Sequence, residues 1–355
     1  MKFGILKETN TVTDRRVALS PDQLAYVQQK YSEAQFEIES DSERIFSDEE
    51  YQNKGVLVTK TCSSCDVLIG ITPIAATDFK ANTSYLFFLE SLKNPLKYQA
   101  HQQAVASRNS YLYDSANWEA TNPGIDFDEI VGIVGAYNAF RAFGIKFELF
   151  KLPPVATFLD VSSIITYLKR PVLPPLKIAI IANEPMTLGI KTVMKALKIK
   201  EVGKTDFLTK NYAQAVFNCV VEEDLIHLDS YTKLTDILIT NAQLNDTPVV
   251  LSSSCLQVTD CKLKVVVDLA PEPSNQLACT VRQSNNEAPF YGYLPIENKE
   301  VDLFHPAAIV VVATPYGAVE LPQMASEQYG KFLIDVVFPA FFSSDSQEIL
   351  TKARL

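Results

Sequence analysis

The chain has 355 residues, 47% of them hydrophobic and 21% charged, which suffices for two domains with buried cores and excludes a disordered protein. Its 42 acidic and 32 basic residues give a net charge of −10, so the surface has no broad positive field for a nucleic acid. No apolar run is long enough to cross a membrane, and the N-terminus lacks the pattern of a secretory signal. We therefore expect a cytoplasmic protein that binds neither nucleic acid nor membrane.

Short runs of β-branched and apolar residues alternate with longer segments of helical period along the chain. This alternation predicts an α/β fold with mainly parallel strands. The strands at 177–182 and 308–313 are apolar without alternation, which is typical of strands covered on both faces. The predicted strands cover residues 2–6, 36–40, 66–71, 84–89, 177–182, 236–240, 264–269 and 308–313.

The predicted helices begin at recognisable signals. Ser20 and Pro21 predict an N-cap followed by a proline in the first turn, and residues 47–50 have the spacing of a capping box. Gly132 and Gly135 lie inside a helical pattern, where small residues suit close helix packing better than phosphate binding. Helices are predicted at 129–143, 162–170, 187–198 and 322–342, the last with apolar faces that require burial.

The cysteines are too thinly spread for a disulfide framework, since the chain has only six of them. Cys62 and Cys65 have the spacing of half a zinc site or of a redox pair. A closed zinc site needs a second pair of ligands, and the chain contains three histidines and no further Cys-x-x-Cys. We therefore expect no metal site, and we interpret the two residues as half-buried thiols beside the strand at 66–71.

The turn after the strand at 177–182 is where a doubly wound nucleotide-binding domain carries its glycines. Here it reads Ala182-Asn183-Glu184-Pro185-Met186-Thr187-Leu188-Gly189, and the chain contains no Gly-x-Gly. A side chain in place of the second glycine holds the backbone away from a pyrophosphate, and the carboxylate of Glu184 repels its charges. The motif therefore predicts no dinucleotide cofactor.

The segment Asp14-Arg15-Arg16-Val17-Ala18-Leu19-Ser20-Pro21 places two guanidinium groups in a loop between a strand and a capped helix. Such a loop suits a bidentate grip on a carboxylate. A pair of solvated surface arginines is the alternative, and the chemistry of the motif alone favours it.

Taken together, Lys2-Phe3-Gly4-Ile5-Leu6-Lys7-Glu8 and Arg15-Arg16-Val17-Ala18-Leu19-Ser20-Pro21 resemble the opening of the superfamily of alanine dehydrogenase, transhydrogenase and lysine-forming saccharopine dehydrogenase. The resemblance covers nearly the whole chain. Segments at 132–138, 265–268, 280–282, 291–293, 320–322 and 325–327 are similar, in the same order, to bacterial saccharopine-dehydrogenase-like oxidoreductases.

This resemblance implies two Rossmann-like domains with parallel sheets and an interdomain cleft. An N-terminal, substrate-type domain would comprise residues 1–131 plus 300–355, and an inserted nucleotide-type domain would comprise residues 132–299. The C-terminal helix would thereby return to the N-terminal domain and bury its apolar faces there.

The resemblance also implies an NAD(P)-dependent oxidoreductase acting on CH–NH groups, in which a lysine and a histidine handle protons. Thr72 stands at the lysine position, and Glu90 at or beside the histidine position. A threonine cannot protonate or polarise an imine as an ammonium does, and a glutamate lacks the neutral-pH pKa of imidazole. The three glycine positions of the cofactor turn hold Ala182, Glu184 and Thr187.

The anion-binding side of the family's site is retained at Arg16, Asp268 and Arg282. Arg16 would hold a substrate carboxylate. Asp268 has either a role in the interdomain cleft or that of an acid capping a buried strand, and Arg282 either binds substrate or only stabilises the fold. The candidate partners are a small carboxylate-bearing molecule and further copies of the chain.

Whether the chain is an enzyme stays open at this point. The first hypothesis is a saccharopine/alanine dehydrogenase-like pseudoenzyme that has lost the dinucleotide fingerprint and the Lys/His pair and binds a small molecule or a regulatory partner. The alternative is an active NAD(P)-dependent amino-acid dehydrogenase with a non-standard cofactor loop and Glu90 as base. A third hypothesis is an enzyme that works without a nicotinamide. We favour the first, because two independent parts of the machinery depart from the family.

Overall fold

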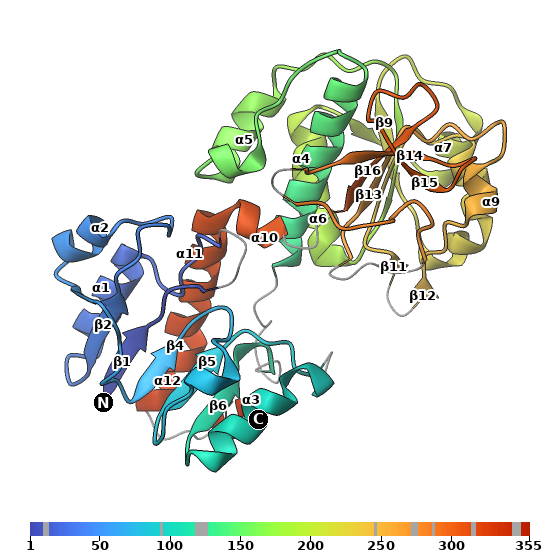
Figure 1. The fold of residues 1–355 in the computed structure, drawn as a ribbon. Coiled ribbons are helices and arrows are strands. Elements are labelled where there is room, and N and C mark those ends of the chain that lie inside the picture. The colour runs from blue at the N-terminus through green and yellow to red at the C-terminus, as the bar shows by residue number, and fades with distance from the viewer. Residues whose placement is uncertain are drawn as a thin grey trace. The chain divides into compact units, whose positions relative to one another are not determined.

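The computed structural model describes residues 1–9, 14–92, 95–117, 127–244, 247–270, 276–285, 288–313, 317–342 and 349–355. The chain divides into unit 1, residues 1–126 and 322–355, and unit 2, residues 127–321. Each unit contains a largely parallel sheet and helices, so the predicted α/β class is confirmed (Figure 1). The units divide at 126/127 and 321/322, whereas the sequence analysis places the boundaries at 131/132 and 299/300. The later second boundary follows from strand β16 (Ile309–Ala313), which pairs with β13 (Val265–Asp268) inside unit 2.

Unit 1 holds a six-stranded, fully parallel sheet in the order β3-β2-β1-β4-β5-β6, which we call sheet 1. This is the strand order of doubly wound folds, in which ligands bind at the carboxyl ends of the strands beside the switch point between β1 and β4. The predictions miss β3, whose apolar run at 56–58 is only three residues long, and β6, in which tyrosines and Asp114 interrupt the apolar pattern. The strands are β1 (Lys2–Ile5), β2 (Gln35–Glu39), β3 (Leu57–Thr59), β4 (Val67–Ile69), β5 (Ser84–Phe87) and β6 (Tyr111–Asp114).

Both predicted N-caps of unit 1 are confirmed as capping boxes, with Ser20 before α1 and Ser47 before α2. The helices of unit 1 are α1 (Pro21–Lys30), α2 (Asp48–Asn53), α3 (Gln99–Ser107), α11 (Pro322–Phe332), α12 (Phe338–Phe342) and α13 (Ile349–Ala353). Shorter turns are η1 (Ala76–Asp78), η2 (Pro95–Tyr98), η3 (Ser115–Asn117) and the π-helical η6 (Leu333–Val337).

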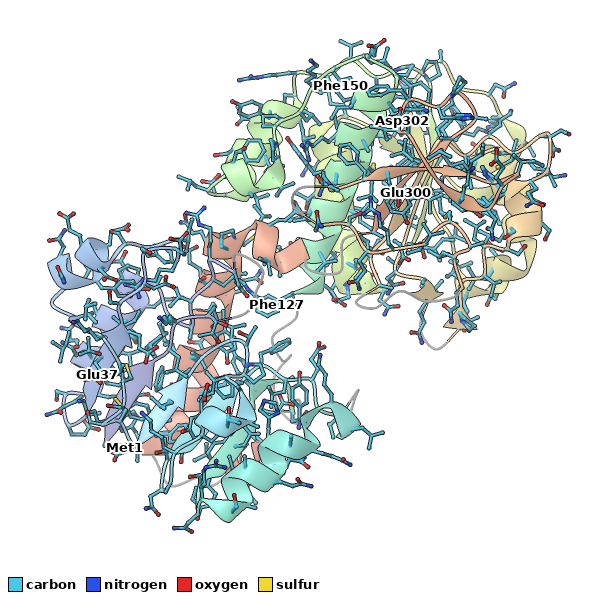
Figure 2. All side chains as sticks on the ribbon, viewed as in Figure 1. Met1, Glu37, Phe127, Phe150, Glu300 and Asp302 are labelled. Carbon is cyan, nitrogen blue, oxygen red and sulfur yellow. The ribbon has the colours of Figure 1, made fainter. Side chains whose placement is uncertain are left out.

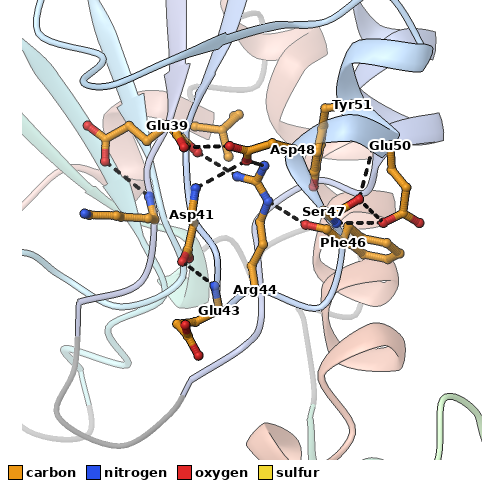
Figure 3. Close-up of polar contacts among 12 residues, drawn as sticks. Glu39, Asp41, Glu43, Arg44, Phe46, Ser47, Asp48, Glu50 and Tyr51 are labelled. Atoms are coloured by element: carbon orange, nitrogen blue, oxygen red, sulfur yellow. Dashed lines mark hydrogen bonds and ion pairs between the residues drawn. The ribbon is translucent and has the colours of Figure 1, made fainter.

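The turn before α2 holds a buried guanidinium whose partners lie in this turn, at the end of β2 and in α2 (Figure 3). Arg44 donates to the backbone oxygens of Glu39 at 2.6 Å and Phe46 at 2.7 Å, and pairs with Asp48. Its guanidinium lies over the ring of Tyr51, 4.4 Å from the centroid. We assign Arg44 a structural role, because these partners account for its burial.

The predicted helix over 322–342 is present as α11, the π-helical turn η6 and α12, one after another. Its apolar side packs on sheet 1: the ring of Phe338 contacts those of Phe3 and Phe36, with centroids 5.6 and 5.8 Å apart. The hydroxyl of Ser326 on α11 accepts a hydrogen bond from the backbone of Val17 at 2.9 Å. The C-terminal segment therefore completes the core of unit 1 and fixes the loop that carries Arg16.

Unit 2 holds sheet 2, eight strands in the order β15-β14-β16-β13-β10-β7-β9-β8. The hairpin β14–β15 adds antiparallel to the parallel part of the sheet. In a doubly wound nucleotide domain the second strand lies beside the first, whereas here β9 lies beside β7 and the two-residue β8 forms the edge. The remaining strands are β7 (Lys177–Ile181), β8 (Lys200–Glu201), β9 (Val216–Cys219), β10 (Ile237–Thr240), β14 (Tyr291–Leu294) and β15 (Lys299–Val301), with a separate hairpin of β11 (Gln243–Leu244) and β12 (Thr247–Pro248).

Two glycines let α4 and α6 cross at close range (Figure 1). A Cβ added to Gly132 would overlap the carbonyl oxygen of Met186, and one added to Gly189 would overlap that of Glu129. The prediction that Gly132 serves helix packing is thus confirmed. No described helix is long and apolar enough to span a bilayer. The helices of unit 2 are α4 (Asp128–Lys146), α5 (Val161–Leu168), α6 (Glu184–Ala196), α7 (Lys204–Thr209), α8 (Leu228–Thr232), α9 (Ser253–Leu256) and α10 (Gly317–Glu320), with turns η4 (Val155–Thr157) and η5 (Glu222–His227).

Candidate functional site

A polar cluster lies at the carboxyl end of sheet 1, beside its switch point. Glu8 follows β1, and its carboxylate accepts hydrogen bonds from the backbone of Ile71 at 2.8 Å and of Thr72 at 3.0 Å, just after β4. The hydroxyl of Thr72 also donates to Glu8. Thr72 therefore points its hydroxyl proton at an internal carboxylate.

Arg16 belongs to the same cluster and is paired within the chain. Its side chain is 9% exposed and that of Asp14 is 5% exposed. The guanidinium contacts both carboxylate oxygens of Asp14, with Nε 2.9 Å from Oδ1 and Nη2 2.7 Å from Oδ2. Arg16 is therefore a buried residue in a bidentate pair, not one of two solvated surface arginines.

The surroundings of Glu8 shift its pKa close to neutral pH. Burial raises the pKa of Glu8 to about 7, and the nearby charge of Asp14 adds to the rise, while the Thr72 hydroxyl and Arg16 oppose it. A carboxyl group that titrates near pH 7 can exchange a proton with a ligand under ordinary conditions. Glu8 is the group in this cluster that sequence reasoning missed, although it stands inside the segment that carries the resemblance.

Tyr329 of α11 closes the cluster from the C-terminal segment. Its hydroxyl donates to the carbonyl oxygen of Gly70 at 3.2 Å and lies 3.1 Å from the hydroxyl of Ser115. Burial raises the pKa of Tyr329, and the carboxylates of Glu8 and Asp114 add to the rise, so the phenol stays protonated. The tyrosine thus supplies a neutral hydroxyl beside the switch point.

Glu90 lies beyond β5 in a strained and tightly held loop. Its φ is +54°, in the left-handed region that a residue with a Cβ rarely adopts. Asp114 at the end of β6 holds the loop on both sides, accepting from the backbone of Leu89 at 2.9 Å and of Ser91 at 2.8 Å. Such backbone strain concentrates at functional sites. Asp114 was missed because the tyrosines of β6 leave no apolar run from which this strand could be predicted.

The cofactor-type turn of unit 2 has a different construction. None of residues 182–187, all of which the structure describes, has a positive φ. The turn is closed instead by the hydroxyl of Thr187, which donates to the carbonyl oxygen of Ala182 at 2.9 Å. Glu184 is exposed at the first position of α6, where the helix N-terminus stabilises a carboxylate. A carboxylate of the chain therefore stands where a dinucleotide would place its phosphates.

The charges around this turn also disfavour an anion. Lys191 on α6 pairs with Glu201 of β8 at 3.1 Å, and both Glu184 and Glu201 raise its pKa. The ammonium of Lys191 is therefore already engaged by carboxylates of the chain. A pyrophosphate would meet repulsion rather than a positively charged cradle.

Asp268 and Arg282 also lie in unit 2, each with partners there. Asp268 ends β13 and accepts hydrogen bonds from the backbone of Ala270 at 3.0 Å and the hydroxyl of Thr280 at 2.8 Å; burial raises its pKa. Arg282 makes a bidentate pair with Glu300, labelled in Figure 2, at 2.8 and 2.9 Å. This geometry is that of a strand-capping acid and a fold-stabilising arginine.

A second buried carboxyl group in unit 2 was also missed. Burial raises the pKa of Glu320 to about 7, and the amide of Asn138 lies 3.4 Å from both its oxygens. Asn138 Oδ1 and Arg141 Nε are among the buried side-chain atoms that lack a hydrogen-bond partner in the described part of the chain. The signal in the sequence was the polar pair of Asn138 and Arg141 inside the otherwise apolar helix α4.

Comparisons with known proteins agree with this architecture. The family model "Alanine dehydrogenase/PNT, N-terminal domain" matches residues 4–113. An L-alanine dehydrogenase structure is similar with a TM-score of 0.68 and 14% identity, covering 100% of this chain and 94% of that one. The transhydrogenase from Sinorhizobium meliloti is similar with a TM-score of 0.60 and 15% identity, covering 100% of this chain and 96% of that one. No curated protein matches the sequence.

Proposed function

We propose, starting from the membership of this chain in the alanine dehydrogenase-like superfamily, that it is a pseudoenzyme: a cytoplasmic small-molecule binder or regulatory subunit that has lost dinucleotide binding and hydride transfer. The observation that carries the proposal is the turn between β7 and α6. It has no left-handed residue and presents the carboxylate of Glu184 at the start of the helix. These residues do not fit a dinucleotide, although the family resemblance implies NAD(P).

The proton-transfer side of the site supports the same proposal independently. Thr72 stands where the family has lysine, and its hydroxyl donates to Glu8. A neutral hydroxyl engaged in this way supplies no positive charge to polarise an imine. The cofactor side and the catalytic side thus both lack the group that the family's chemistry requires.

The ligand of such a protein would bind at the carboxyl end of sheet 1. Arg16 supports a carboxylate-bearing ligand, because its guanidinium has the bidentate geometry that carboxylates match. Asp14 now fills that place, so a ligand carboxylate would have to exchange with it. We therefore expect a bound ligand to displace Asp14. We also expect a ligand with further negative charges to bind more weakly, because the carboxylates of Glu8 and Asp14 would repel it.

The test is a titration of the purified protein with NADH and NADPH to about 1 mM, followed by nicotinamide fluorescence and by thermal stabilisation, since bound ligand stabilises the folded state. An active L-alanine dehydrogenase is the positive control. A ligand present at about 100 times its Kd stabilises a protein by about 2.7 kcal/mol, which a melting curve resolves. We expect neither nucleotide to raise the melting temperature or to change the nicotinamide fluorescence. Saturable binding of either nucleotide would contradict the proposal.

Two matched variants separate the charge of the turn from its shape. Glu184→Gln removes the carboxylate at the helix start, while Glu201→Gln removes the one that pairs with Lys191. We expect both variants to remain unable to bind nucleotide, because the backbone of the turn is unchanged. Binding by the Glu184 variant alone would mean that charge, rather than shape, excludes the cofactor.

A second candidate is an active NAD(P)-dependent amino-acid dehydrogenase with a non-standard cofactor loop. The strained, clamped Glu90 and the pKa of Glu8 near 7 favour it, because both are properties of acid–base groups. It predicts stereospecific, NAD(P)H-dependent turnover of a 2-oxo acid and an amine, with a lower kcat in Glu90→Gln and a higher KM in Arg16→Ala. Such turnover would overturn the pseudoenzyme proposal.

A further inference from the structure

Three buried side chains with metal-ligating atoms meet in unit 1, away from the cluster of Glu8 and Arg16. Glu37 lies on β2, and Cys62 and Cys65 lie in the loop between β3 and β4. One ligand atom from each lies within 4.8 Å of the others. The three residues are 2%, 1% and 5% exposed. Figure 2 shows yellow sulfur atoms beside the labelled Glu37.

The sheet is shaped to receive the two thiols. Gly4 on β1 faces them, and a Cβ at this position would lie 2.5 Å from Cys62 Cβ and 2.9 Å from Cys65 Sγ. The loop is held by hydrogen bonds from the backbone of Cys62 to the carboxylate of Glu39 at 3.1 Å and from the backbone of Cys65 to the carbonyl of Cys62 at 3.2 Å. Any side chain at Gly4 would therefore push the cysteines off the sheet.

The two oxygens of Glu37 have different partners. Oε1 accepts a hydrogen bond from the thiol of Cys65 at 3.2 Å, and Oε2 pairs with the ammonium of Lys2 at 2.7 Å. Lys2 also donates to the hydroxyl of Ser64 at 2.7 Å. A carboxylate held by one oxygen and directed at a thiol by the other has the arrangement of a metal ligand with its supporting outer partner.

We propose that Glu37, Cys62 and Cys65 bind a thiophilic divalent cation, with zinc as the ion that fits best. Sulfur and carboxylate ligands are those that zinc prefers, with a solvent molecule in the fourth tetrahedral position. Two thiolates and one carboxylate carry three negative charges, which a divalent ion and the Lys2 ammonium together balance. A buried site with no net charge avoids the desolvation penalty that an unbalanced one incurs.

This proposal departs from our expectation that the chain has no metal site, and it is independent of the proposed function. The expectation rested on the missing second pair of cysteine or histidine ligands. The third ligand comes instead from a carboxylate on a neighbouring strand, which no spacing rule connects with Cys62 and Cys65. The bound ion would join β2 to the loop between β3 and β4, so it would stabilise this edge of sheet 1.

The test uses the full-length protein, reduced with a phosphine and titrated first with Co²⁺ and then with Zn²⁺. We expect one ion per chain, a thiolate-to-cobalt charge-transfer band, and loss of that band on addition of zinc. Release of about two protons per ion should accompany binding, because both thiols must deprotonate. Zinc should also raise the melting temperature.

Variants locate the site. Cys62→Ser and Cys65→Ser should each abolish the charge-transfer band, and Glu37→Gln should weaken binding. Lys2→Gln should weaken it about 10–100-fold, as loss of an outer partner does. Cys261→Ser, which removes a thiol of unit 2, is the matched control and should bind like the unchanged protein. Melting curves without metal confirm that each variant folds.

Three outcomes would overturn the proposal. One is the absence of a charge-transfer band in the unchanged, fully reduced protein. Another is a band that persists in both cysteine variants, which would place the ion elsewhere. The last is a band lost equally in the Cys261 control, which would mean that binding reports only general thiol content.

Discussion

In both units the carboxyl ends of the parallel strands are the position where a doubly wound sheet binds a ligand. The side chains at this position differ between the two sheets. At the end of sheet 1, Glu8, Asp14, Arg16 and Thr72 form a mostly buried network of charges and hydrogen bonds. At the start of α6 in unit 2, Glu184 is exposed, and the side chain of Thr187 donates a hydrogen bond that closes the turn. The switch point of a doubly wound sheet supplies a position for a ligand, and only the side chains and backbone at that position make it a site.

The difference arises from the helices that pack near the strand ends in each unit. In unit 1, the C-terminal helix α11 brings Tyr329 over the strand ends and encloses polar groups that must then find partners. In unit 2, α4 packs against α6 so closely that glycines are required where the helices cross. The two helices therefore contact each other directly, and the side chain of Glu184 is exposed rather than enclosed between them.

The largest expected effect is the loss of stability when the arginine is removed from the buried pair, compared with its removal from the exposed pair. Arg16→Ala should destabilise the protein by about 3–5 kcal/mol, because it leaves buried carboxylates without their counter-charge. Arg282→Ala should cost at most about 1 kcal/mol, because the side chains of Arg282 and Glu300 are 34% and 41% exposed. Urea unfolding of both variants measures the difference. Equal losses would show that the burial of the Arg16 pair has no energetic consequence.

The pH dependence of stability should follow Glu8, the glutamate of unit 1 whose pKa is raised. The pKa of Glu8 is raised from 4.5 to about 7 in the folded state, so its contribution to stability is full below pH 4.5 and is lost as pH rises through 7. The change between these limits is on the order of 3 kcal/mol. Glu8→Gln should remove this component, so the variant should lose less stability than the unchanged protein between about pH 5 and pH 8.

Glu320 provides the comparison within unit 2, because burial raises its pKa to about 7 as well. Glu320→Gln should flatten the same pH range, and the double variant should be flatter than either single one. The test is the free energy of unfolding of the unchanged protein, the two single variants and the double variant, each measured at about pH 5 and about pH 8. Identical pH profiles for the double variant and the unchanged protein would contradict both assignments.

The smallest expected effect sharpens the packing side of the comparison. Gly189→Ala should destabilise the protein by about 1–3 kcal/mol, although alanine favours a helix, because its Cβ would overlap the carbonyl oxygen of Glu129. Gly203→Ala is the matched control, since a Cβ there meets no atom within 4 Å. Thermal melts of the two variants give the test. A variant at Gly189 as stable as the control would mean that α4 and α6 do not cross closely.

Much of the fold could be predicted because its signals are local. The apolar runs at 177–182 and 308–313 became β7 and β16, and the serine caps at Ser20 and Ser47 start α1 and α2. Strands such as β6 and β9 could not be predicted, because Asp114 and two tyrosines in β6 and Asn218 in β9 interrupt their apolar runs. Their positions depend on pairing with neighbours that are distant in the chain.

The sequence by itself determined the α/β class, the helix caps and the absence of a glycine turn after β7. These properties depend on which residues stand at consecutive positions. Tertiary structure alone decided that Asp14 pairs with the guanidinium of Arg16, that Asp114 holds the loop at Glu90, and that Glu37 lies beside Cys62 and Cys65. Such contacts join separate strands and loops, so burial and proximity in space, rather than spacing along the chain, set their charge and chemistry.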